Sequence, residues 1–287
     1  MIQYNNNLGV LPFYANKNEQ NHRRSYAYGQ VYPLYTPMGS VPPFNFVIPH
    51  TTATISAVRV FRLWNDTNYN VRSTMIARGL RKVNYTAKGY DVIEYPSIAP
   101  HNITLEEGQH YLRITLSDGT VYNSDIFTVV GDLSGYLCIT WYDLQDFVMD
   151  SSCIAYGHGY RSTLYLNTQL GKPEYEFNEE GETRDGYFFP EKQISEKKYK
   201  CNILAPEYLC DVMRFIRLSD IVEVRDQYGN LYRADTFLIT PKWETQGDLA
   251  SVEVEFTCDT VAKKIGFAVT GNIGDYNNDY NNDFDNE

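Results

Sequence analysis

Histidine is the side chain best suited to acid–base chemistry near neutral pH, and its placement in this sequence matches no catalytic motif. A hydrolytic triad brings a nucleophile, a histidine and an acid together. The chain has no Gly-x-Ser-x-Gly elbow, and its histidines are dispersed, with His50, His101, His110 and His158 far apart. His158 is the most suggestive, because its two glycine neighbours would let the backbone approach a ligand closely. We favour the simpler interpretation, a loop histidine at a turn.

Carboxylates are numerous, but none stands out as half of a glycosidase pair, whose two acids must lie at a set separation. The candidates are Asp143, Asp146, Glu174, Glu176, Glu179, Glu180 and Glu182. A cluster of this kind in an acidic loop, here residues 178–182, is typical of a solvated face. Asp and Asn repeat through residues 275–285, without the glycine and closing glutamate of a calcium loop. Phosphate-binding glycine motifs do not occur. We therefore predict that the protein is not an enzyme and has no catalytic residues, metal or cofactor.

Composition narrows the possible classes of protein further. The chain has 287 residues with 43% hydrophobic content, which is enough for a core and excludes wholesale disorder. Tyrosine accounts for 25 residues and suits strands and interfaces. The formal net charge of −11 argues against nucleic acid as the main partner, because phosphate binding needs clustered positive charge.

The sequence carries no sign of export or membrane insertion. The first residues lack the basic and apolar regions of a signal peptide, and no apolar run is long enough for a membrane span. Five cysteines occur without C-x-x-C spacing, which favours free, buried thiols in a protein made in a cytoplasm.

Both ends of the chain are predicted to be docking arms. Residues 1–45 combine prolines and Asn-rich stretches with interleaved aromatics, which predicts an extended arm. This arm either packs on its own domain or docks on a neighbouring subunit, and we favour the neighbour. Residues 269–287 form an acidic Asn/Asp-rich tail. The aromatic side chains predicted to contact other subunits are Phe13, Tyr26, Tyr28, Tyr32, Tyr35, Tyr276, Tyr280 and Phe284.

Between the arms, alternating hydrophobicity predicts a mainly β chain. Residues 46–132 contain short strands with regular turn signals, including a hairpin around Asp118-Gly119, and we expect an immunoglobulin-like β-sandwich. A glycine-rich joint at 131–135 leads to a second β-sheet domain over 133–268. That domain contains one short helix at 206–218, with Pro206 at its first position and Leu209, Val212, Met213 and Ile216 on one face.

Several stretches together resemble a known group of proteins. They are residues 107–130, 174–177, 185–197, 204–211 and 240–256. In sequence texture they resemble virion structural proteins of phages and prophages of Bacteroidales, including crAss-like phages. The resemblance implies a tail- or portal-proximal component without catalytic residues. Together with the predicted arms, the missing export signal and the free thiols, it leads us to expect a homo-oligomeric ring or adaptor protein that is made in the bacterial cytoplasm and located in the virion tail. Its partners would be copies of itself and the portal, tail or neighbouring ring proteins.

Two other functions compete with this one. A carbohydrate- or receptor-binding module on the phage tail would display aromatic platforms, for which the candidates are Trp64, Trp141 and Trp243, although core tryptophan is the simpler interpretation. A glycoside hydrolase ranks last, because nothing selects its two acids.

Overall fold

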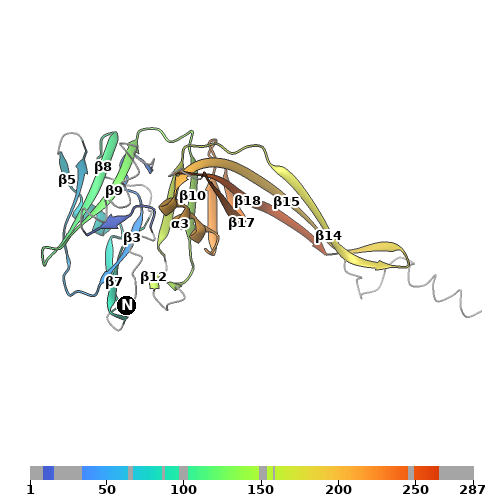
Figure 1. The fold of residues 1–287 in the computed structure, drawn as a ribbon, viewed down its shortest axis with the longest axis horizontal. Coiled ribbons are helices and arrows are strands. Elements are labelled where there is room, and N and C mark those ends of the chain that lie inside the picture. The colour runs from blue at the N-terminus through green and yellow to red at the C-terminus, as the bar shows by residue number, and fades with distance from the viewer. Residues whose placement is uncertain are drawn as a thin grey trace, which may run out of the picture.

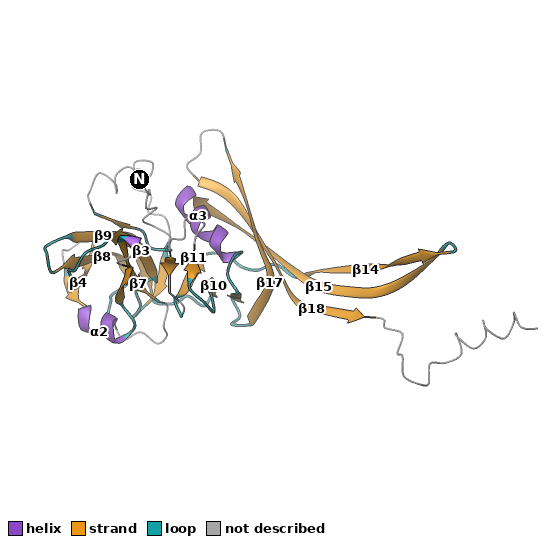
Figure 2. Ribbon diagram, turned by 90° about the horizontal axis from the view of Figure 1, so that it is seen from below, coloured by secondary structure: helices purple, strands orange, loops and turns teal. Residues whose placement is uncertain are grey.

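The computed structural model describes residues 9–15, 34–63, 67–85, 88–96, 103–148, 154–157, 159–244 and 249–264. Within these ranges the protein is mainly β, as predicted, with two short helices (Figures 1 and 2). The strands of the first half are β1 (Phe13–Tyr14), β2 (Tyr35–Pro37), β3 (Phe44–Pro49), β4 (Ile55–Arg62), β5 (Asn68–Asn70), β6 (Arg81–Tyr85), β7 (Tyr90–Tyr95), β8 (Gly108–Leu116) and β9 (Val121–Val130). Those of the second half are β10 (Leu137–Tyr142), β11 (Phe147–Val148), β12 (Ile154–Tyr156), β13 (Arg161–Leu166), β14 (Glu174–Arg184), β15 (Tyr187–Pro206), β16 (Ile221–Arg225), β17 (Leu231–Trp243) and β18 (Leu249–Lys264).

One 13-stranded sheet runs through most of the molecule in the order β14-β15-β18-β17-β16-β10-β13-β2-β9-β8-β4-β5, with β1 on β9. The predicted joint at 131–135 is the connection between β9 and β10, and the sheet continues past it through β2. This short strand is parallel to β9 and antiparallel to β13. A segment assigned from the sequence to the arm therefore joins the two halves of the sheet.

A second, three-stranded sheet, β3-β7-β6, packs against the main sheet in the first half. Phe46 on β3 contacts Tyr122 on β9, with ring centroids 5.3 Å apart, and stacks on Phe13 of β1 at 4.5 Å. All six residues of β7 are buried, because β3 and β6 flank this strand and β12 packs across it. The hairpin at Asp118-Gly119 is present as predicted, with Gly119 at φ +88°.

The predicted helix is α3 (Glu207–Ile216), which packs on β15, β17 and β18 (Figure 2). Its buried face contains Leu209, Val212, Met213 and Ile216, the residues that the 3.6-residue period selects. Pro206 precedes the first helical residue as the N-cap and has extended backbone angles. A second helix, α2 (Arg72–Ala77), was not predicted. Six residues with one buried side chain, Met75, leave too little periodicity to detect.

The most visible feature of the molecule is a long hairpin, β14 and β15, that projects from the body (Figures 1 and 2). The sequence prediction was wrong here. Residues 178–182 are not an acidic loop, because β14 continues through them to Arg184 while β15 runs for 20 residues. β18 pairs with β15 from Pro206 out to Lys192, and β17 pairs with β18 closer to the body.

The described parts of the predicted N-terminal arm are integrated into the body. Val10, Leu11, Phe13 and Leu34 are all buried in the main core. In these parts the chain follows the other alternative, packing on its own domain. Residues 16–33 and 265–287, which include most of the predicted interface aromatics, lie outside the described residues.

Candidate interaction surface

Two residues form the turn of the projecting hairpin. Asp185 and Gly186 connect the directly paired residues Arg184 and Tyr187, and both turn residues have positive φ, 50° and 84°. A two-residue connection of this kind matches the twist of the flanking strands. The Asp-Gly pair therefore closes a tight hairpin in place of a loop and allows two long strands to form.

Opposite charges on facing strands explain why so acidic a segment is a strand. Lys198 on β15 forms ion pairs with Glu176 on β14 and, at 3.3 Å, with Glu255 on β18. Lys200 contacts Glu174 at 3.1 Å and Glu255 at 3.7 Å. The hydrogen bond that Lys198 donates to Glu176 is the largest cause that raises the pKa of Lys198. This charge ladder covers one face of the hairpin base, since alternate residues of a strand share a face.

The opposite face of the same strands carries apolar side chains out beyond the body, together with Lys197, which lies opposite Tyr175 and pairs with Asp259 at 2.8 Å. Near the body, Tyr199 on β15 is buried and stacks on Phe256 of β18 at 5.3 Å. Towards the turn the same face carries Tyr175, Phe177 and Val261, which are 72%, 61% and 65% exposed. Phe177 lies opposite Ser195, which in turn lies opposite Val261. The core face of the sheet thus continues into solvent as a hydrophobic stripe, which the Lys197–Asp259 ion pair interrupts.

Three consecutive aromatic residues stand at the tip. Tyr187, Phe188 and Phe189 are 73%, 48% and 50% exposed. Because side chains alternate along β15, Tyr187 and Phe189 share one face and Phe188 points to the other. Solvent-exposed aromatic residues gathered on one projection are typical of an interaction site.

A pocket of about 410 Å³ opens on the body at the base of the hairpin. Of the two predicted interface residues that the structure describes, Tyr35 lines this pocket, and its ring contacts Tyr136 edge-on at 5.0 Å. The other residues of the lining are apolar or uncharged, among them Leu34, Leu166, Asn202, Leu204 and Tyr208. Its rim residue Leu204 is 66% exposed.

The remaining predicted interface residues do not gather at one place. Phe13 is 2% exposed and belongs to the core of its own chain. Tyr26, Tyr28, Tyr32, Tyr276, Tyr280 and Phe284 lie outside the described residues. The aromatic residues of the hairpin were not among the predicted interface residues. The sequence Tyr-Phe-Phe directly after Asp-Gly nevertheless indicates a hairpin with an aromatic strand.

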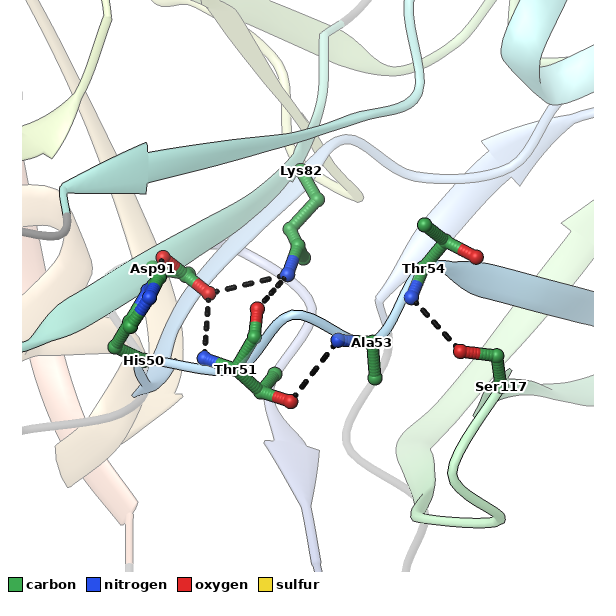
Figure 3. A network of polar contacts seen from close by, with 7 residues as sticks. All are labelled: His50, Thr51, Ala53, Thr54, Lys82, Asp91 and Ser117. Atoms are coloured by element: carbon green, nitrogen blue, oxygen red, sulfur yellow. Dashed lines mark hydrogen bonds and ion pairs between the residues drawn. The ribbon is translucent and has the colours of Figure 1, made fainter.

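The buried polar cluster best suited to chemistry lies in the first half (Figure 3). Asp91 of β7 is fully buried, accepts a hydrogen bond from the Thr51 backbone N–H at 3.0 Å and lies 3.1 Å from Lys82 Nζ. His50 Nδ1 is 2.8 Å from the same carboxylate. Burial raises the pKa of Asp91, but the hydrogen bonds from His50, Thr51 and Lys82 outweigh burial and lower it overall.

This cluster holds a chain connection in place. Lys82 also donates to the Thr51 carbonyl, and Thr54 N–H donates to Ser117 Oγ at 3.0 Å, so residues 50–54 are tied to both sheets where the chain crosses between them (Figure 3). Within the described part of the chain, the Asp91 carboxylate is the partner of the His50 ring.

Other groups considered from the sequence have structural partners. Asp143 accepts hydrogen bonds from Tyr156 and from the Asp220 backbone N–H. Trp141 is buried, whereas Trp243 is 46% exposed. His158, Trp64 and Cys153 lie outside the described residues.

The described thiols are unpaired, as predicted. Burial raises the pKa of Cys201 to about 12 and that of Cys210 to about 11, so both stay protonated at neutral pH and are poor nucleophiles. Within the described ranges, no three His, Cys, Asp or Glu side chains are grouped for metal binding. The helices there are also too short or too polar to cross a membrane.

Comparisons with protein-family models, with curated proteins and with solved structures found no match.

Proposed function

We propose that this protein is a structural component of a bacteriophage virion, a ring or adaptor protein of the tail or portal region that binds copies of itself. The observation that carries the proposal is the hairpin, whose hydrophobic stripe and aromatic tip project from the body without a covering element among the described residues. Such a projection contributes little to the fold of its own chain and suits contact with another molecule.

The exposed area supports this role. A fully buried aromatic side chain removes about 150–250 Å² from water, so the five exposed aromatics of the hairpin offer roughly 600 Å². A standard protein–protein interface buries about 800 Å² on each partner. The hairpin therefore offers apolar area close to one partner's share of a subunit contact, spread over its two faces.

The finer architecture belongs to the same proposal. Two packed sheets in the first half are compatible with an immunoglobulin-like sandwich, a common module of surface and assembly proteins. The resemblance of residues 107–130 and 240–256 to phage virion proteins supports a place in the virion tail, after synthesis in the host cytoplasm. Portal, tail or neighbouring ring proteins would be the other partners, and the terminal segments would add contacts to the subunit interface.

Labelling of particles tests this function directly. Antibodies raised against the purified chain should label the tail region of phage particles from a host that carries the gene, and mass spectrometry of purified particles should detect the chain at several copies per particle. Absence of the chain from purified particles would overturn the proposal. A glycan array with the same protein addresses the receptor-binding alternative, for which Trp243 is the exposed candidate among the two tryptophans that the structure describes.

A further inference from the structure

We propose that the aromatic tip of the hairpin of one copy docks in the pocket at the hairpin base of a second copy, head to tail. The inference rests on the proposed self-assembly and names the two surfaces that meet. One is the tip, with Tyr187 and Phe189 on one face. The other is the pocket beside Tyr35 and Leu204.

The tip cannot reach the pocket of its own chain. Both lie on the same strand, since β15 starts at Tyr187 and its far end, Asn202 to Pro206, lines the pocket. At about 3.3 Å per residue, Phe189 and Ile203 are roughly 45 Å apart. The hairpin points away from the body (Figure 1). A partner for the tip must therefore be another molecule.

The pocket matches the tip in size. A cavity of about 150 Å³ accepts one benzene-sized ring, so a pocket of about 410 Å³ holds roughly two. Tyr187 and Phe189 place two exposed rings on one face of the tip. The pocket accordingly has room for the pair.

The pocket also matches the tip in chemistry. Its lining combines apolar side chains with uncharged amide and hydroxyl groups from Asn167, Asn202 and Ser251. Apolar walls suit the rings, while amides both donate and accept hydrogen bonds and suit the Tyr187 hydroxyl and the backbone of the turn. None of the residues that form this lining is charged, so aromatic rings enter without displacing an ion pair.

Head-to-tail contact between two different patches has a geometric consequence. Each copy presents one tip and one pocket, so the contact repeats and yields a ring if the rotation closes, or a filament if it does not. Removing one patch from a copy stops growth at that copy.

Complementary variants test the contact in the full-length chain. Tyr187→Ser with Phe189→Ser removes the tip rings, and Leu204→Arg puts a charge at the pocket rim. Asn202→Trp is a second pocket variant that fills the space from an exposed position. Leu144→Ser is the matched control, because Leu144 is as exposed as Leu204 (67% and 66%). It follows the last residue of β10, whereas the pocket residue Leu166 pairs with the first residue of that strand. Thermal unfolding checks that every variant folds as the unchanged chain does.

Sedimentation velocity at several concentrations gives the result. We expect the unchanged chain and Leu144→Ser to self-associate, and the tip and pocket variants each to be monomeric. An equimolar mixture of tip and pocket variants should give a dimer and nothing larger, because one intact tip and one intact pocket remain. Folded variants that assemble like the unchanged chain, a mixture without dimer, or an unchanged chain that is monomeric at about 100 µM would each overturn the inference. Particle labelling stands apart from all three outcomes and tests the proposed function separately.

Discussion

Phe46 in the body and Phe177 on the hairpin are both strand phenylalanines in an alternating pattern, but they have opposite surroundings. Phe46 is 2% exposed and packs between Phe13 and Tyr122, whereas Phe177 is 61% exposed. The second sheet covers the body strands, and nothing among the described residues covers the hairpin. The body thus uses its apolar face for folding, and the hairpin keeps the same kind of face available for a partner.

Polar groups differ in the same way. Asp91 is fully buried among partners that fix one chain crossing, whereas Lys198 and its glutamates lie on an open face where water competes with each pair. A buried carboxylate depends strongly on its partners, because a group left unpaired inside the protein is costly. An exposed pair contributes little.

The largest expected effect comes from the phenylalanine pair. Phe46→Ala should lower the free energy of unfolding by about 3–5 kcal/mol, because it removes a buried ring and leaves a cavity. Phe177→Ala is the matched change on the hairpin and should lower it by less than about 0.5 kcal/mol, as exposed substitutions do. Urea unfolding of both variants measures the two values, and equal losses would contradict the contrast between body and hairpin.

Asp91→Asn should be next in size. The change leaves Lys82, whose side chain is only 9% exposed, without a compensating charge, and we expect a loss of about 3 kcal/mol. Lys198→Ala on the hairpin is the exposed counterpart. An Asp91→Asn variant as stable as the unchanged protein would show that the buried cluster does not hold the crossing.

The pH dependence of stability sharpens the account of Asp91. Its pKa is lower in the folded protein than the ordinary value of 3.8. The stabilisation is therefore present above about pH 3.8 and is lost as the pH falls through the folded value. The gap in unfolding free energy between the unchanged protein and Asp91→Asn should accordingly narrow below pH 3.8. A gap that stays constant from pH 6 to pH 3 would contradict this.

The smallest effect is expected for the charge ladder. Lys198→Ala removes pairs to Glu176 and Glu255, and partly exposed pairs of this kind contribute about 0.2–1 kcal/mol. Salt screens such pairs, so the difference from the unchanged protein should shrink further in 0.5 M NaCl. A large loss of unfolding free energy that salt does not change would mean that the charge pairs of the hairpin stabilise the protein as strongly as the buried cluster of the body does.

Local pattern was sufficient for part of the fold and not for the rest. The α3 face, the Asp118-Gly119 hairpin and most strand centres follow from periodicity and turn chemistry within a few residues. The long hairpin does not, because the strand character of residues 178–182 depends on residues on the facing strand, such as Lys192 opposite Glu180. The position of β2 between the two halves of the sheet could not be predicted either. This strand has only three residues, too few for a hydrophobic period, and it pairs with strands far away in sequence.

The sequence predicted an aromatic contact surface but not its location in the fold. Tyrosine content and interleaved aromatics indicate contact surfaces, yet Phe13 is in the core, while the exposed rings of Tyr187 and Phe189 stand on a strand that the sequence alone leaves undefined. Exposure is a property of the whole fold. The sequence of a strand therefore does not show whether a second sheet covers its aromatic residues.

One measurement tests the central claim, assembly through the hairpin, most directly. Replacing Gly181–Glu191 with Asn-Gly joins the paired residues Glu180 and Lys192 through a two-residue turn and removes the aromatic tip while leaving the body intact. Sedimentation velocity should then find a monomer at concentrations where the full-length chain self-associates. A shortened chain that folds and still assembles to the same size would contradict the account.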